Sequence, residues 1–510
     1  MKRFSSGLVV TLLAVFPLAA HAQRNTIGIV HFSTSCAPAA TARFDSAVAL
    51  LHSFEFGAAI RTFGNVLGAD STCAMANWGI ALSRWSNPMA AGNRPVALLT
   101  QGRQSVNEAV RLASHASERE RGYIDAVGKL YEDFEHTNQL ARLVAYEQAM
   151  KQLAIRFPAD TEAAIFHALS LTASASPTDK TYAKQLEAGA ILEKLWVAQP
   201  NHPGIAHYII HSYDYPALAE KARKAAAQYS TIAPSAAHAL HMPSHTFTRT
   251  GMWSGSAEAN EKSKKAAEAA GSIAEALHAS DYAMYAYLQM GKESEAKAIL
   301  DDLPRLEARF DPTAVTGAAP GWAGLFALAA IPARWALERG QWSEAAVLVP
   351  RRTTFPYAEA MTHFARALGA AHTGDLAKAR ESVDSLASVQ KILEGKGEQY
   401  WAEQTAILDL AARAWLELVE HKNDAALQHM REAVAREDAT EKDAVTPGPL
   451  APARELLGDM LVELGRPAEA IPEYRKALAK EPNRRHSLRR LESLNSHNTA
   501  SAEHGHSPHP

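Results

Sequence analysis

The stretch Leu457-Gly-Asp-Met-Leu-Val-Glu-Leu-Gly465-Arg-Pro-Ala-Glu-Ala470-Ile-Pro-Glu-Tyr474, with Pro482 behind it, decides the fold of this chain. It predicts a helix, a turn at Gly465 and a second helix on which Ala470 and Tyr474 lie one turn apart. Pro482 then predicts the end of the second helix, because proline lacks an N–H and disfavours continuation of a helix. The stretch is therefore a helical hairpin.

The spacing of these residues resembles the tetratricopeptide repeat (TPR), a helix–turn–helix unit of about 34 residues. Weaker copies of the pattern recur around Gly251, Gly291, Gly340 and Gly374. In such repeats a small residue lets two helices approach closely, and each hairpin buries its apolar side against its neighbours. We therefore expect an all-α protein, an α-solenoid of TPR-like helical hairpins with a concave face.

Composition supports a helical globular protein and excludes several functional classes. The chain has 510 residues, of which 47% are hydrophobic, 21% are charged and only 28 are glycine. Its formal net charge of −3 gives no basic excess, so we expect no nucleic-acid partner. Beyond the first residues, the sequence contains no apolar run of about 20 residues, so we expect no membrane-spanning helix.

The first residues predict export. Lys2 and Arg3 precede an apolar run over residues 7–20, and Ala20-His-Ala22 has the small-x-small form of a signal-peptidase site. We expect residues 1–22 to be a signal peptide and the mature protein to be periplasmic or secreted. Because disulfides persist outside the cytoplasm, Cys36 and Cys73 are expected to form one. The alternative is two unrelated buried thiols.

Loop-like segments divide the mature chain. Residues 311–322 and 440–452 have the proline and glycine density of loops. We predict a TPR-like array over residues 23–310, a linker or insertion over 311–322 and a second array over 323–492. The polar, histidine-containing tail, residues 493–510, is expected to be disordered.

Three further stretches resemble a group of exported bacterial TPR proteins. They are His31-Phe-Ser-Thr-Ser-Cys36, His241-Met-Pro-Ser-His245 and Thr446-Pro-Gly-Pro-Leu-Ala-Pro-Ala-Arg-Glu-Leu-Leu-Gly458. The resemblance implies a fold and a compartment, and it implies no particular reaction.

Histidines gather at the positions of the hairpins that commonly face the groove of TPR proteins, the second, fifth and ninth residues of each first helix. Counting back from the turns that close the hairpins, we find an imidazole, carboxylate or phenol at these positions on four successive first helices. These residues are His167; His207 and His211; His238, His241 and His245; and His278, Asp281 and Tyr285.

Two histidine pairs predict a metal site. His207 and His211 on one hairpin, and His241 and His245 on the next, each have i, i+4 spacing, which places two imidazoles on one helix face. We predict that these four bind one divalent transition metal, Zn, Cu or Fe. Further candidates for outer-sphere partners or substrate contacts are His167, His238, His278, Asp214, Asp281, Tyr213 and Tyr285.

Other interpretations of the histidines stay open. Pro243 lies between His241 and His245 and favours a helix that begins near it, which would distort the pair. Buried histidines can also be ordinary hydrogen-bonded core residues. In function, the alternative to a metal centre is a non-enzymatic adaptor that binds a peptide or protein partner in the groove. The sequence predicts neither a reaction nor whether the protein is an enzyme.

Overall fold

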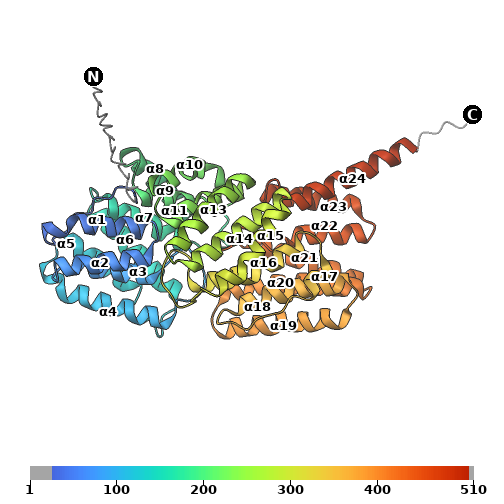
Figure 1. The fold of residues 1–510 in the computed structure, drawn as a ribbon, viewed down its shortest axis with the longest axis horizontal. Coiled ribbons are helices and arrows are strands. Elements are labelled where there is room, and N and C mark those ends of the chain that lie inside the picture. Colours follow the sequence, from blue (N-terminus) through green and yellow to red (C-terminus); the bar gives the residue numbers. More distant parts are fainter. Residues whose placement is uncertain (1–25, 505–510) are drawn as a thin grey trace, which may run out of the picture.

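The protein is a stack of helices joined by turns and by longer segments such as residues 308–320 and 440–452. The computed structural model describes residues 26–504, with side chains described up to residue 496, and no strand occurs in this range. Successive helices pack as antiparallel hairpins, so the predicted all-α, TPR-like solenoid is confirmed. Figure 1 shows the hairpins progressing from the blue helices at one end to the orange and red helices at the other. The predicted signal peptide lies outside the described residues.

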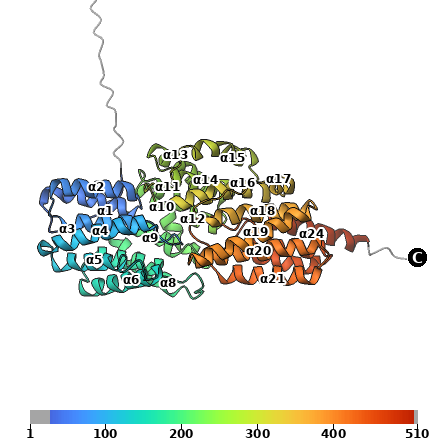
Figure 2. The same ribbon diagram turned by 90° about the horizontal axis from the view of Figure 1, so that it is seen from below.

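The first array consists of hairpins that lead from the N-terminal segment to the histidine-rich helices. Its helices are α1 (Thr41–His52), α2 (Phe56–Ala69), α3 (Ala74–Trp85), α4 (Val96–Leu112), α5 (Glu118–Lys129), α6 (Gln139–Arg156), α7 (Thr161–Ala173), α8 (Ala183–Ala198), α9 (Pro203–Ser212), α10 (Arg223–Ile232), α11 (Ala237–His241), α12 (Pro243–Arg249), α13 (Trp253–Ala269), α14 (Ile273–Met290) and α15 (Glu293–Glu307). The array curves enough for α1 to contact α9, as the view in Figure 2 also indicates.

The second array continues the same arrangement to the C-terminus. Its helices are α16 (Gly321–Leu337), α17 (Trp342–Ala346), α18 (Pro356–His372), α19 (Leu376–Gly395), α20 (Gln399–Val419), α21 (Asn423–Ala439), α22 (Ala453–Glu463), α23 (Pro467–Lys480) and α24 (Arg485–His504). The predicted turns lie where expected. Gly291, Gly374 and Gly465 each follow a first helix with φ of 71°, 78° and 72°, a left-handed conformation that favours glycine.

The segment predicted as a linker, residues 311–322, packs against the first array. The backbone N–H of Gly57 donates to the carbonyl of Thr316 at 2.8 Å, and the N–H of Ala319 donates to Glu275 at 2.8 Å. Its last two residues begin α16. One apolar cluster includes residues from α14, α15 and α16, so the core continues across this segment.

The last helix extends into the segment that was predicted as a tail. Residues 493–510 were expected to be disordered, yet α24 extends to His504. Leu491 and Leu494 pack against the core of the second array, which anchors the helix where the polar tail begins. Residues 505–510 lie outside the described residues.

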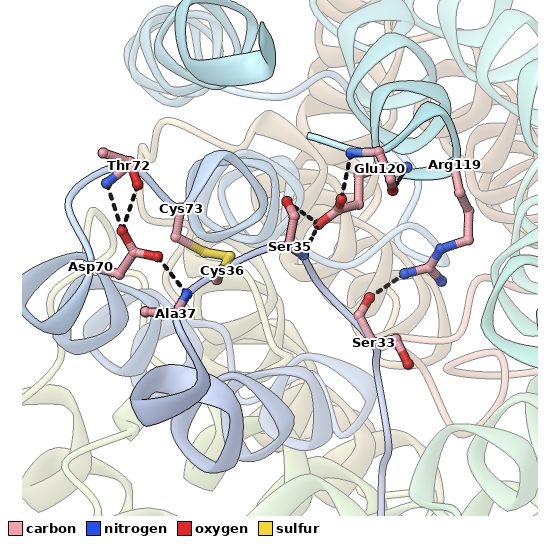
Figure 3. The surroundings of a disulfide bond; sticks show 10 residues. Ser33, Ser35, Cys36, Ala37, Asp70, Thr72, Cys73, Arg119 and Glu120 are labelled. Carbon is pink, nitrogen blue, oxygen red and sulfur yellow. Dashed lines mark hydrogen bonds between the residues drawn. A yellow bond between two sulfur atoms is a disulfide. The ribbon is translucent and has the colours of Figure 1, made fainter. Parts of the chain in front are cut away.

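The predicted disulfide between Cys36 and Cys73 is present, with Cα atoms 4.9 Å apart (Figure 3). Polar contacts hold the segment on both sides of it. Asp70 accepts a hydrogen bond from the N–H of Ala37 at 2.7 Å, and Glu120 accepts one from the N–H of Ser35 at 2.7 Å. The N-terminal segment is thereby fastened to the first hairpins. Among the described residues, no helix combines the length and the apolar character needed to cross a lipid bilayer.

Candidate metal centre

Helices α9, α11, α12 and α14 bring the central histidines together in the interior. Pro243 begins α12, and Met242 keeps helical dihedral angles (φ −54°, ψ −35°) between α11 and α12. The chain therefore continues in nearly helical form past the proline, and His241 and His245 stay on neighbouring turns. Six imidazoles become buried here, with exposed fractions of 0–5%: His207, His211, His238, His241, His245 and His278.

The first group, named here the His241 triad, consists of His241, His245 and His278. The Nε2 atoms of His241 and His245 lie 2.9 Å apart, and those of His241 and His278 lie 3.0 Å apart. The opposite ring atoms are held from outside. The Nδ1 of His241 lies 2.6 Å from Asn260 Oδ1, and the Nδ1 of His245 lies 2.8 Å from Asp214 Oδ2.

These outer contacts fix the tautomers of two imidazoles. A carboxylate oxygen only accepts, so Nδ1 of His245 must donate to Asp214. The amide nitrogen of Asn260 donates to the carbonyl of Ser256 at 2.7 Å, which leaves its oxygen to accept from His241. In the neutral rings, Nε2 of His241 and of His245 then carry lone pairs that face each other. Such a carboxylate or amide behind an imidazole is the usual arrangement around a bound metal.

The second group, named here the His207 triad, consists of His207, His211 and His238. The Nδ1 of His207 donates to the carbonyl of His52 at 2.6 Å, and the Nδ1 of His238 lies 2.9 Å from Glu275 Oε1. The Nε2 atoms of all three imidazoles are buried without a hydrogen-bond partner. Unpartnered buried nitrogens are uncommon in a protein interior and call for an explanation.

Burial makes protonation of five of the imidazoles in the two triads unfavourable. It holds the pKa of His207, His211, His241 and His278 well below the usual range, and neighbouring imidazoles lower each of them further. Burial also lowers the pKa of His245, although Asp214 opposes the shift. These five rings are thus neutral at physiological pH, which is the form that binds a metal.

Asp214 joins the triads to two cations. Its Oδ1 accepts from Nε of Arg249 at 2.8 Å, and Nζ of Lys442 lies 3.6 Å from Oδ2. Although burial opposes ionisation, Lys442, Arg249 and His245 hold the pKa of Asp214 well below its usual range. Burial and Arg249 in turn lower the pKa of Lys442 to about 8. Asp214 is therefore a buried carboxylate behind His245. Its role as an outer-sphere partner of a metal stays a prediction.

A third group of titratable residues lies nearby and has a different character. Glu162 accepts from Nε2 of His52 at 2.9 Å and from Nε2 of His202 at 2.8 Å. Here the imidazole nitrogens point at a carboxylate that holds them, so their hydrogen bonds are complete on that side. We interpret this group as a structural network between α1, α7 and α9.

Residues 440–452 cover the histidine core from the second array. The hydroxyl of Tyr282 donates to the carbonyls of Ala444 and Thr446 at 2.8 and 3.1 Å, and Lys442 reaches Asp214. The groove that the repeats predict is thus filled at this place. A cavity of about 280 Å³ remains beside it, with His211, Asp214 and Lys442 in its wall.

The structure divides the four predicted ligands between two groups. His207 and His211 meet His238, whereas His241 and His245 meet His278. The division follows from which helices face each other. His238, near the start of α11, faces His207 on α9, and His278 on α14 faces His241 on α11. His238 and His278, expected as outer-sphere or substrate contacts, thereby become equal members of the triads.

Four other predicted residues lie outside the triads. Asp281 pairs with Arg334. The hydroxyl of Tyr213 donates to Glu193, and that of Tyr285 donates to Glu481. His167 is buried on α7 with an unpartnered Nε2, and it belongs to neither triad.

Sequence reasoning missed several residues that support the site. Tyr282 packs its ring against all three members of the His241 triad, with centroids 4.8–5.2 Å away. Its i, i+4 spacing from His278 was a signal that could have identified it, and Glu275 lies one turn before His278. Asn260 lies on the following helix, α13, and Lys442 lies in a distant segment; neither carries a comparable signal.

Comparison with known proteins adds little to this description. No protein-family model matches the chain, and no curated protein matches it. Among solved structures, the human IFIT1 dimer with m7Gppp-AAAA is 13% identical, with a TM-score of 0.36 over 79% of this chain and 89% of that chain. Yeast Tom70 is 9% identical, with a TM-score of 0.29 over 89% and 88%. Similarity at this level carries no argument about function.

Proposed function

We propose that this chain is an exported TPR-like protein whose buried histidine core binds divalent transition-metal ions, of which Zn, Cu and Fe are the candidates. Imidazole is a ligand for all three. Both cysteines form the disulfide, so neither offers a thiolate to a metal. The disulfide is also consistent with an oxidising compartment, either periplasmic or extracellular.

One observation carries the proposal: Nε2 of His241 lies 2.9 Å from Nε2 of His245 and 3.0 Å from Nε2 of His278, and the three residues offer ligand nitrogens within 4.8 Å of one another. Two lone pairs that face each other at such a distance repel unless a cation lies between them. A shared proton joins two nitrogens, whereas a metal ion joins three. At a metal–nitrogen distance of about 2.0–2.1 Å, adjacent ligands of an octahedral or tetragonal set lie about 2.9 Å apart, and tetrahedral ligands about 3.3 Å. The observed spacing fits the first arrangement and needs a small opening for the second.

The alternative function is a non-enzymatic adaptor that binds a peptide or protein in the groove. The histidines that were expected to line an open groove are buried, and residues 440–452 lie over them. A peptide would have to displace this segment to reach them. The proposed metal centre requires no such rearrangement, since the ligands already converge.

Metal analysis tests the proposal. The mature chain from residue 23, with the tail histidines His497, His504, His506 and His509 replaced by alanine, is reconstituted with Zn, Cu, Fe or Ni and desalted. We expect at least one tightly bound equivalent of one of these metals. The double variant His245→Ala/His278→Ala should lose the ion of that triad.

The matched control is His167→Ala, which removes a buried helix histidine that belongs to neither triad. It should retain the wild-type metal content, and all variants should keep their helical circular dichroism. If the wild-type protein binds none of the four metals, the metal centre is excluded and the adaptor function is favoured.

A further inference from the structure

The His207 triad has the same construction as the His241 triad and needs the same explanation. In each triad two imidazoles are anchored through Nδ1 by an oxygen behind the ring, and Nε2 faces inward. In the His207 triad the anchors are the carbonyl of His52 and the carboxylate of Glu275. Since these acceptors fix the proton on Nδ1, Nε2 of His207 and of His238 carry lone pairs.

The two triads lie directly against each other. The rings of His211 and His245 have centroids 5.7 Å apart, and so do the rings of His238 and His241. Within the triads, ring centroids such as those of His207 and His238 lie 5.0 Å apart. The ring separation between the triads is therefore close to the ring separation within them, so ions bound by the two triads would be neighbours in one core.

Buried carboxylates surround the pair of triads and suit a site of high positive charge. Asp214 lies behind the His241 triad and Glu275 behind the His207 triad. Glu55 accepts from the backbone N–H of His238 at 3.3 Å. All three are at least 90% buried. Asp214 already has Arg249 and Lys442 as counter-charges. The hydrogen-bond donors to Glu275 and Glu55 are an imidazole and backbone N–H groups, so bound divalent ions would supply the charge that balances a buried carboxylate there.

We propose that the histidine core is a dinuclear centre, in which each triad binds one divalent transition-metal ion and a water-derived oxygen ligand bridges the two. The inference rests on the proposed metal-binding function and adds its nuclearity. Three nitrogens per ion leave coordination positions open for small exogenous ligands. His211 faces the cavity of about 280 Å³, so a small anion such as azide reaches the ions from that side.

Copper loading of the tail-substituted mature protein tests the nuclearity. We expect two Cu(II) per chain, a paramagnetic resonance signal much smaller than two spins because the bridge couples the ions, and a spectral change on addition of azide. His207→Ala/His238→Ala and His241→Ala/His278→Ala should each retain one copper and show a full one-spin signal. His167→Ala, the control, should behave as the wild type.

The outcomes separate this inference from the metal-binding function. One copper per wild-type chain would overturn the dinuclear centre and leave a single metal site intact. Two coppers with a full two-spin signal would also overturn it, because the ions would then be independent. No bound copper, zinc, iron or nickel would contradict both proposals. The wild-type copper content and spin count decide the matter even if a double variant fails to fold.

Discussion

Asp214→Asn is the most informative single substitution, because Asp214 connects the His241 triad to the charges around it. Its two oxygens accept separately from Nδ1 of His245 and from Nε of Arg249, each at 2.8 Å. An asparagine has one accepting oxygen and one donating nitrogen. In either orientation, the amide nitrogen faces Nδ1 of His245 or Nε of Arg249, so two donors meet. The negative charge beside Arg249 and Lys442 is also lost.

Two effects of different size follow. Loss of the partner behind a ligating histidine lowers metal affinity by about 10- to 100-fold, which corresponds to about 1.4–2.7 kcal/mol. Loss of the charge from a buried ion pair destabilises the fold by about 3–5 kcal/mol. We therefore expect Asp214→Asn to fold less stably and also to release metal to a chelator at lower chelator concentration.

Asp281→Asn is the matched control. Asp281 is also buried and pairs with Arg334 Nε at 2.8 Å, and it belongs to neither triad. The control should lose folding stability to a similar extent and keep the wild-type metal affinity in a chelator competition titration. Equal affinity losses in both variants would mean that the effect comes from general destabilisation, and unchanged affinity in Asp214→Asn would refute the positioning role.

Two further predictions concern stability. Replacing Cys36 and Cys73 by serine removes a covalent link across a sequence separation of 37 residues. Chemical denaturation should then show a loss of about 4 kcal/mol in the free energy of unfolding. An unchanged value would mean that the bond does not constrain the unfolded chain. Burial, with Lys480 opposing it, raises the pKa of Glu437 from 4.5 to about 7. The folded state then binds more protons between these pH values, so this carboxyl lowers stability as pH rises from 4.5 to 7, by at most about 3 kcal/mol. Glu437→Gln should flatten that part of the stability–pH curve, and a curve of unchanged slope would contradict the assignment.

The hairpins were predictable because their signals are local. Gly465 with Ala470 and Tyr474 determines a turn and a close helix contact within one repeat, and the structure places the hydroxyl of Tyr474 on Asp459 of the partner helix. The disulfide was predictable because only two cysteines were available. In both cases the residues that decide the structure lie near each other in sequence or are few enough to leave one choice.

The composition of the histidine groups depended on distant contacts. Spacing identified the histidine positions on α9, α11 and α12, but it could not decide which helix faces which. That is why His238 joined His207 and His211 in the structure, although sequence paired the histidines by hairpin. The cover formed by residues 440–452 depends on contacts such as that of Lys442 with Asp214, more than 200 residues away along the chain, and no local pattern predicts such contacts.

Anomalous X-ray diffraction at the absorption edge of the bound metal, from crystals of the reconstituted protein, tests the presence of metal in the histidine core most directly. We predict a peak about 2.0–2.2 Å from the Nε2 atoms of His241, His245 and His278, with a second peak at the His207 triad. Metal-loaded crystals with no peak inside the core, or with peaks only at surface residues, would contradict it.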